Sequence, residues 1–204
     1  MTHTGLFVVV EGPNGVGKST AIELATEIVR ERLSRSVHAT REPSSTSLGA
    51  SIRELEPTLP REALALACAA DRHDHVRREI EPALDAGAIV VTDRYVPSTL
   101  VLQRLDGLDL EYVWALNSGV RVPDLTVYLD DEADAITSRL AERDTKSRFE
   151  HGGTAEKERE LYAQASDFLG KQGWPQLVVD CRGLSAEAVS EALAGAIVAI
   201  ASSD

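Results

Sequence analysis

A stretch near the start of the sequence contains residues whose types and spacing suit them to hold a chain of phosphates. The stretch VVVEGPNGVGKST meets the spacing G-x-x-x-x-G-K-S/T of a phosphate-binding loop, with Gly12, Gly17, Lys18 and Ser19. Glycines let backbone N–H groups turn toward anionic oxygens, and the following helix points its positive end at the same oxygens. Lys18 can reach the β- and γ-phosphates of a nucleoside triphosphate, and the Ser19 hydroxyl can ligate Mg²⁺. We therefore predict a site for a nucleoside triphosphate and Mg²⁺ in this loop.

Charged side chains also follow two other apolar stretches. TREPSSTSLG puts Arg41 and Glu42 at the end of one stretch, and VVTDRYVPST puts Asp93 and Arg94 at the end of the other. A carboxylate beside the loop can hold or orient hydrated Mg²⁺ together with Ser19. A guanidinium suits a phosphate because it can donate two parallel hydrogen bonds. Two such arginines opposite the loop predict a second anionic site that faces the first.

The stretch ALACAADRHDHV reads as an Ala-rich helix that carries Arg72. Taken alone, this arginine could face the second anionic site or form a structural ion pair. The same stretch raises the question of a metal site, because Asp71 shares a helix face with Asp74 or with His75. Two such ligands make a poor metal site, so this interpretation is disfavoured.

The segment RLAERDTKSRFE is strongly basic, with Arg139, Arg143, Lys146 and Arg148. A charged surface is the simplest interpretation. A mobile lid fits better, because phosphoryl transfer needs cations that close over the developing charge and exclude water. We expect residues 143–150 to form this lid.

The elements that must position these groups alternate between strands and helices, which is typical of a parallel sheet with helices on both faces. Apolar runs predict strands at Leu6–Glu11, Val37–Thr40, Ala88–Thr92, Leu125–Leu129 and Leu177–Asp180. Helices are predicted at Lys18–Leu33, Pro60–Ala86, twice between Pro97 and Val120, and at Glu132–Arg143, Thr154–Gln172 and Ser185–Ala201. No linker or repeat divides the chain, so we predict one domain over residues 1–204. Its functional loops should lie at the carboxyl ends of the strands.

Composition limits the classes of protein that the sequence can encode. The 204 residues carry a formal net charge of -12, which disfavours a nucleic-acid partner. Cys68 and Cys181 form no C-x-x-C pair, which fits a reducing cytoplasm and no metal or disulfide framework. The first residues lack the features of a signal peptide, and the longest apolar run is too short to span a bilayer. We expect a cytoplasmic protein without a membrane partner.

Several of these motifs occur in the order and spacing of one family. EGPNGVGKST, TREP, AADR, DRY followed by ST and Q, PDLTVYLD and RFE together resemble thymidylate kinase over nearly the full length of the chain. The resemblance implies an α/β, three-layer P-loop nucleoside monophosphate kinase fold, with a five-stranded parallel sheet and a short lid. It also implies Mg²⁺-dependent transfer of the γ-phosphate of ATP to dTMP or a closely related pyrimidine nucleoside monophosphate, and a homodimer.

The resemblance assigns roles to individual residues. Catalytic roles fall to Lys18, Arg94, Arg143 and Arg148. ATP binding falls to Gly12, Asn14, Gly15, Gly17, Lys18, Ser19, Thr20 and Arg139, with Ser19 and Asp93 at the metal. Acceptor binding falls to Asn14, Arg41, Cys68, Arg72, Arg94, Ser98, Thr99, Leu102 and Gln103. Because position 15 is Gly rather than Arg, the chain looks like the bacterial type, in which the catalytic arginine comes from the lid.

Three positions depart from the family pattern, and all concern the acceptor. Cys68 replaces the aromatic ring that stacks on thymine, Leu102 replaces a tyrosine beside the 2′ side of the sugar, and Asn14 replaces an aspartate associated with the 3′-hydroxyl. A specialised kinase for a ribo- or 5-modified pyrimidine monophosphate is therefore an alternative. A nucleotide-dependent switch or a noncatalytic binding module is a third possibility. It is disfavoured because the N-K-x-D pattern is absent while Lys18, Asp93 and the lid cations are present.

Overall fold

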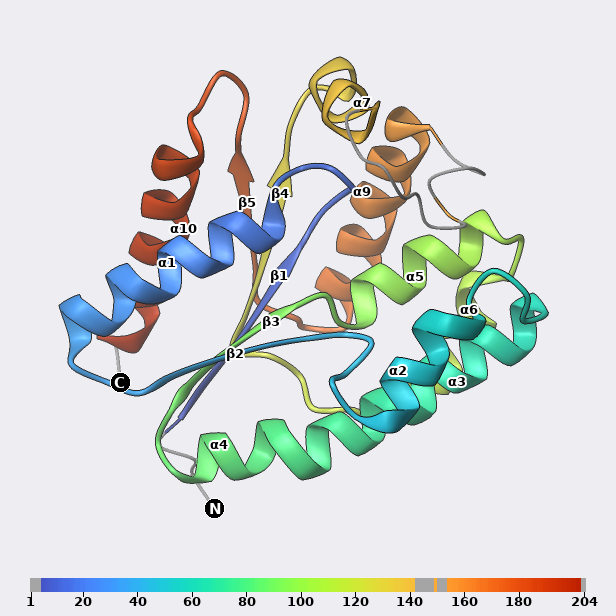
Figure 1. Ribbon diagram of the computed structural model, residues 1–204, viewed down its shortest axis with the longest axis horizontal. Helices are drawn as coiled ribbons and strands as arrows, with labels where there is room; N and C mark the ends of the chain where they lie inside the picture. Colours follow the sequence, from blue (N-terminus) through green and yellow to red (C-terminus); the bar gives the residue numbers. More distant parts are fainter. Residues whose placement is uncertain (1–4, 142–148, 150–153, 203–204) are drawn as a thin grey trace.

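The computed structural model describes residues 5–141, 149 and 154–202, which form an α/β fold around one parallel sheet (Figure 1). The strand order is β2-β3-β1-β4-β5 and each neighbouring pair is parallel. The strands are β1 (Leu6–Glu11), β2 (Val37–Arg41), β3 (Ile89–Asp93), β4 (Leu125–Asp130) and β5 (Gln176–Asp180). The five predicted strands are confirmed, and their ends differ from the prediction by at most one residue.

Helices connect the strands and cover both faces of the sheet. They are α1 (Lys18–Leu33), α2 (Ser47–Leu55), α3 (Arg61–His75), η1 (Val76–Ile80), α4 (Glu81–Asp85), α5 (Val96–Leu105), α6 (Leu110–Asn117), α7 (Ala133–Ala141), α9 (Ala155–Lys171) and α10 (Ala186–Ala201). The single helix predicted over Pro60–Ala86 is interrupted by a π-helical turn at η1. Helix α2 was missed; the Thr46 hydroxyl starts it by accepting a hydrogen bond from the backbone of Gly49.

Two apolar layers enclose the sheet, and alternate residues of β1 belong to different layers. Val8 and Val10 pack with α1 and α10 on one face, whereas Phe7 and Val9 pack with η1, α4, α5 and α9 on the other (Figure 1). A strand covered on both faces is apolar at every position, not only at every second one. This explains the continuous run LFVVV that leads into the phosphate loop.

The parallel arrangement brings the carboxyl ends of all strands to one edge of the sheet. β1 lies between β3 and β4, so the loop after β1 is flanked by the residues that follow β3 and β4. Ligands of open α/β sheets bind at this edge, where the order of the strands reverses. No helix in the described ranges is long and apolar enough to cross a membrane.

Candidate active site

The loop between β1 and α1 has the backbone that a phosphate site requires. Gly12 has φ 140°, and a Cβ atom there would lie 2.3 Å from the carbonyl oxygen of Leu129. Only glycine fits such a close approach. Gly17, with φ 102°, is the residue immediately before α1, so the chain enters the helix from a left-handed conformation. Because the first N–H groups of α1 have no partners within the helix, they are free to face an anion.

Lys18 is buried against the phosphate-binding loop. Its Nζ donates to the carbonyl oxygens of Gly12, at 2.7 Å, and Pro13, at 2.9 Å. Burial lowers the pKa of Lys18 to about 7, and the charge of Arg94 acts in the same direction. A polyphosphate bound in the loop would favour the charged form of this lysine, because an opposite charge nearby raises the pKa of an amine.

Ser19 and Asp93, the predicted metal pair, lie together. The Ser19 hydroxyl, at the start of α1, donates to Asp93 Oδ2 at the end of β3 over 2.7 Å. The other oxygen, Asp93 Oδ1, is buried and accepts no hydrogen bond from any residue in the described ranges. A carboxylate with an unused oxygen beside a hydroxyl is the hard oxygen donor set that Mg²⁺ prefers, so these residues fit the ion.

Arg94 reaches the tip of the phosphate loop from the turn after β3. Its Nη2 donates to Asn14 Oδ1 over 2.5 Å, and its Nη1 donates to the Ser98 hydroxyl over 2.9 Å. Its backbone has φ 74°, a left-handed conformation that costs a non-glycine residue about 1–3 kcal/mol. Burial opposes the charge of this guanidinium, but Tyr162, Asp93 and neighbouring carboxylates outweigh it and raise the pKa of Arg94. Arg94 is therefore a fixed positive charge.

Glu158 of α9 holds the loop from the other side. One carboxylate oxygen accepts the backbone N–H of Asn14 at 2.8 Å, and the other accepts the side-chain amide at 3.1 Å. The amide of Asn14 thus donates to Glu158 while its oxygen accepts from Arg94. Sequence reasoning missed Glu158, because nothing near it in the chain marks it as a partner of the loop.

Glu11 is a second buried carboxylate that sequence reasoning missed as a site residue. It accepts hydrogen bonds from the backbone N–H of Tyr95 (2.7 Å), from the hydroxyl of Ser98 (2.6 Å) and from the hydroxyl of Tyr162 (3.2 Å). Burial raises the pKa of Glu11 above its ordinary value. Its position offered a signal, since it is an acidic residue that ends an apolar strand directly before the loop. Glu11 fixes the turn that carries Arg94.

A pocket of about 140 Å³ opens between α2, α3, α5 and the loop, and we name it the Arg72 pocket. The predicted acceptor-binding residues line it, with the exception of Arg41: polar groups come from Asn14, Arg72, Arg94, Ser98, Thr99 and Gln103, and the remaining wall from Cys68 and Leu102. Arg41 is exposed and lines a different hollow together with Ser19 and Asp93.

Arg72 is only 3% exposed, and the protein itself uses most of its donors. Nε donates to Glu42 at 2.7 Å, and Nη2 donates to the Thr99 hydroxyl at 2.7 Å and to the Tyr95 carbonyl at 3.1 Å. Nη1 donates to Asn117. A guanidinium has five N–H groups, so these four hydrogen bonds leave at most one for a ligand. The structural ion pair considered from the sequence is therefore real, and it lies in the wall of the pocket.

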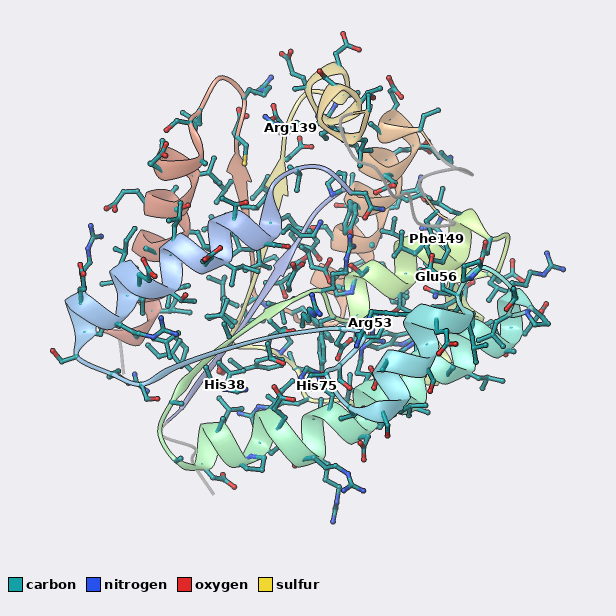
Figure 2. All side chains as sticks on the ribbon, viewed as in Figure 1. His38, Arg53, Glu56, His75, Arg139 and Phe149 are labelled. Carbon is teal, nitrogen blue, oxygen red and sulfur yellow. The ribbon has the colours of Figure 1, made fainter. Side chains whose placement is uncertain are left out.

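Phe149 supplies an aromatic ring to the same pocket (Figure 2). It packs with Ile52 and Leu64, and Cys68 and Leu102 lie against this cluster. Burial raises the pKa of the Cys68 thiol to about 12, so Cys68 presents a neutral surface. The motif RFE was expected in the lid, and sequence reasoning did not place its ring in the Arg72 pocket.

Beside the loop, a polar hollow runs along Asn14, Gly15, Gly17, Lys18, Ser19, Thr20, Asp93 and Arg94, and we name it the phosphate hollow. A further hollow lies between Thr20 and the predicted ATP ligand Arg139 of α7, whose Nη2 is 2.8 Å from Asp131 Oδ2 (Figure 2). The predicted lid arginines Arg143 and Arg148 lie outside the described residues. Their roles stay predictions.

Asp71 and His75, for which a metal site was considered and disfavoured, have protein partners. The Asp71 carboxylate accepts hydrogen bonds from the backbone N–H and the hydroxyl of Ser44, each at 2.6 Å. The ring of His75 lies between Thr40 and Glu42. Within the described ranges, no three His, Cys, Asp or Glu residues gather as a metal site would require.

The phosphate hollow and the Arg72 pocket meet at Arg94 and Asn14, which line both. A phosphate loop, a serine–aspartate pair suited to Mg²⁺ and an adjoining pocket for a small acceptor define a P-loop kinase of the nucleoside monophosphate type. A family model described as thymidylate kinase matches residues 10–172. The chain belongs to the thymidylate kinase family and is a phosphotransferase.

Similar proteins of known sequence agree with this assignment. A probable thymidylate kinase of Pyrobaculum aerophilum is 38% identical over 177 residues, which cover 83% of this chain and 85% of the relative. A probable thymidylate kinase of Caldivirga maquilingensis is 42% identical over 149 residues, covering 71% and 72%. One from Thermococcus gammatolerans is 39% identical over 157 residues, covering 72% and 75%.

Proposed function

We propose that this protein transfers the γ-phosphate of ATP to dTMP and releases dTDP and ADP. The observation that carries the proposal is the shared boundary of the two cavities, where Arg94 and Asn14 line both the phosphate hollow and the Arg72 pocket. A phosphate in each cavity would meet at that boundary. Positioning of two bound reactants supplies much of the rate of phosphoryl transfer, since the protein forms no covalent bond to the phosphate.

The charged side chains at this boundary have separate roles in the proposed reaction. Lys18 stabilises the negative charge on the phosphoryl group during its transfer, and Arg94 binds the phosphate of the acceptor. Ser19 and Asp93 would hold Mg²⁺, which neutralises charge on the β- and γ-phosphates when it is bound. We assign the remaining transition-state cation to Arg143 or Arg148, as in the bacterial type that the chain resembles.

The Arg72 pocket has aromatic lining residues, Tyr95 and Phe149, although position 68 carries no ring. We propose that the ring of Phe149 contributes the stacking surface for the pyrimidine, because it lines the pocket and belongs to the cluster against which Cys68 and Leu102 pack. A base that stacks on an aromatic side chain gains about 1–3 kcal/mol. Cys68 and Leu102 have no ring where the family resemblance expects one. A ribo- or 5-modified pyrimidine monophosphate is thus a second candidate acceptor.

A coupled assay with ATP and a panel of acceptors tests both candidates. The panel contains dTMP, dUMP, UMP, CMP and 5-substituted pyrimidine monophosphates. We expect turnover of dTMP, with discrimination against ribonucleotides weaker than about 100-fold, because Leu102 stands where the family resemblance expects a tyrosine beside the 2′ side of the sugar. Absence of turnover with every pyrimidine monophosphate would refute the proposed function. A preference for dTMP of several orders of magnitude over every ribonucleotide would refute the second candidate.

Variants of the pocket test separately the contributions of positions 68 and 102 and of Phe149 to acceptor binding. Cys68→Phe combined with Leu102→Tyr should raise kcat/KM for dTMP relative to UMP by about tenfold or more, through a new stack and a new clash. Phe149→Leu should raise the KM for dTMP and leave the KM for ATP unchanged. The matched control is Leu59→Met, because Leu59 packs against the same cluster but does not line the pocket. An unchanged dTMP KM in Phe149→Leu would show that the ring is packing only.

We further propose that the protein is a homodimer. Apolar side chains are exposed on neighbouring helices, with Leu48 and Leu55 on α2, Leu66 on α3 and Tyr112 on α6. The family resemblance implies a homodimer, and we assign this surface to the second copy of the chain. Light scattering after size-exclusion chromatography tests it, and a monomer at micromolar concentration contradicts it.

A further inference from the structure

His75 lies fully buried behind the Arg72 pocket, between two carboxylates. Its Nδ1 is 3.3 Å from Glu42 Oε1, and its Nε2 is 3.6 Å from Glu79 Oε2 and 2.9 Å from the Thr40 hydroxyl. The chain of contacts continues on both sides. The other oxygen of Glu42 accepts from Arg72, whereas the other oxygen of Glu79 lies 2.9 Å from a ring nitrogen of the half-exposed His38 (Figure 2).

The groups that face the ring favour its charged form. Glu42 follows β2, Glu79 comes from η1, and Asp71 lies one turn earlier on α3; all three attract a positive charge. Arg72 stands on the far side of Glu42. Burial lowers the pKa of His75, but the hydrogen bond to Glu42 and the charges of the carboxylates outweigh burial and raise it above the ordinary value. The carboxylates around the ring therefore stabilise its protonated form.

A protonated ring can donate from both nitrogens, whereas a neutral ring can donate from only one. We propose that His75 is a positioning residue for the acceptor site: its protonated ring holds the Glu42 carboxylate, and Glu42 in turn holds Arg72 in the pocket wall. His75 itself does not line the pocket, so it acts through these two residues. The proposal rests on the proposed function, because the pocket must take a nucleoside monophosphate for the effect to be measured.

The sign of the pH dependence follows from the raised pKa. The charged ring is present below the pKa of His75 in the folded protein, and it is lost as the pH rises through that pKa. Loss of the proton removes one of the two cations that bracket Glu42. Arg72 then has a less constrained partner, and acceptor binding weakens at alkaline pH.

Steady-state kinetics from pH 6 to 9.5 test this in the full-length protein. In the wild type we expect the KM for dTMP to rise about fivefold across the upper half of this range, within the size of coupling that packed networks transmit. In His75→Gln the KM should already be raised at pH 6.5 and stay flat. The KM for ATP and its pH profile should match the wild type. His73→Gln is the matched control, because His73 is exposed on the same helix, and it should keep the wild-type profile.

A second variant keeps the test informative if His75→Gln does not fold. Glu79→Gln removes one of the two carboxylates beside the ring but leaves the ring and Glu42 in place. The pKa of His75 should fall, so the rise in the KM for dTMP should move to lower pH. A wild-type profile in Glu79→Gln, or in a folded His75→Gln, overturns the proposal. Turnover by the wild type in the same experiment shows that such a failure belongs to His75, whereas no turnover at any pH refutes the proposed function and this inference with it.

Discussion

The buried ion pair between Arg72 and Glu42 offers the sharpest test of how the pocket wall is built. Replacement of Arg72 by methionine, a side chain of similar length, removes the guanidinium and leaves Glu42, Thr99 and Asn117 without their donor. Both members of the pair are buried, with side-chain exposures of 3% and 5%. Loss of one partner from such a pair costs about 3–5 kcal/mol of folding stability, because the other charge stays buried without compensation.

The magnitude can be checked by urea unfolding of Arg72→Met, Glu42→Gln and the double variant. With a slope of about 2 kcal/mol per molar urea, each single variant should lower the midpoint by about 1.5–2.5 M. In the double variant no unpaired charge of this pair remains. The stability lost by the double variant should therefore be about that lost by one single variant and not the sum of the two, which is a coupling of about 3–5 kcal/mol.

The matched control is Arg78→Met, one to two turns along the same run of helix. Arg78 pairs with Asp74 at the surface, and its side chain is 74% exposed. An exposed pair of this kind contributes about 0.2–1 kcal/mol. If Arg72→Met loses no more stability than Arg78→Met, or if the two single losses add in the double variant, the assignment of a buried, coupled pair is refuted.

Four further outcomes follow from the site. Lys18→Ala should abolish turnover at unchanged circular dichroism; activity above a few per cent of the wild-type kcat would remove Lys18 from the mechanism. Because the pKa of Lys18 is about 7 in the free protein, ATP binding above that pH should take up a proton. Calorimetry in buffers of different ionisation enthalpy measures this uptake, and Lys18→Ala should lose it. Asp93→Asn should raise the Mg²⁺ concentration for half-maximal rate at least about tenfold, since the metal loses its charged ligand. The more important of Arg143→Ala and Arg148→Ala should lower kcat by about 10³-fold with little change in the KM for dTMP, and two near-normal kcat values would place that cation elsewhere.

The strands and the phosphate loop could be predicted because their signals are local. The run from Leu6 to Glu11 is apolar at every position, and the spacing from Gly12 to Ser19 is fixed by the loop that it forms. Helix α2 was not predicted although Leu48, Ile52 and Leu55 recur at helical spacing, because the helix is only nine residues long and two of these three side chains are exposed.

The residues that hold the site in place could not be predicted, because their partners are distant in the chain. Glu11 binds groups 84 to 151 positions away. Phe149 belongs to a basic segment by sequence, yet it packs into the Arg72 pocket. The role of Arg72, as a member of an ion pair or as a ligand contact, could not be decided from the sequence. A sequence does not show whether the fold brings a carboxylate such as Glu42 next to the guanidinium. The partners of these residues are set by tertiary packing between elements that are distant in the sequence.

The contact between Asn14 and Glu158 limits the order in which substitutions can accumulate. Aspartate at position 14 could not donate to Glu158 and would set two carboxylates within hydrogen-bond distance of each other. One of the two would have to take up a proton or move away. Asn14→Asp alone should therefore be deleterious, whereas the same change should be tolerated after Glu158→Gln, whose amide can donate. Positions 14 and 158, which are 144 residues apart, are therefore expected to change together. The substitution at Glu158 in α9 should come before the substitution at Asn14.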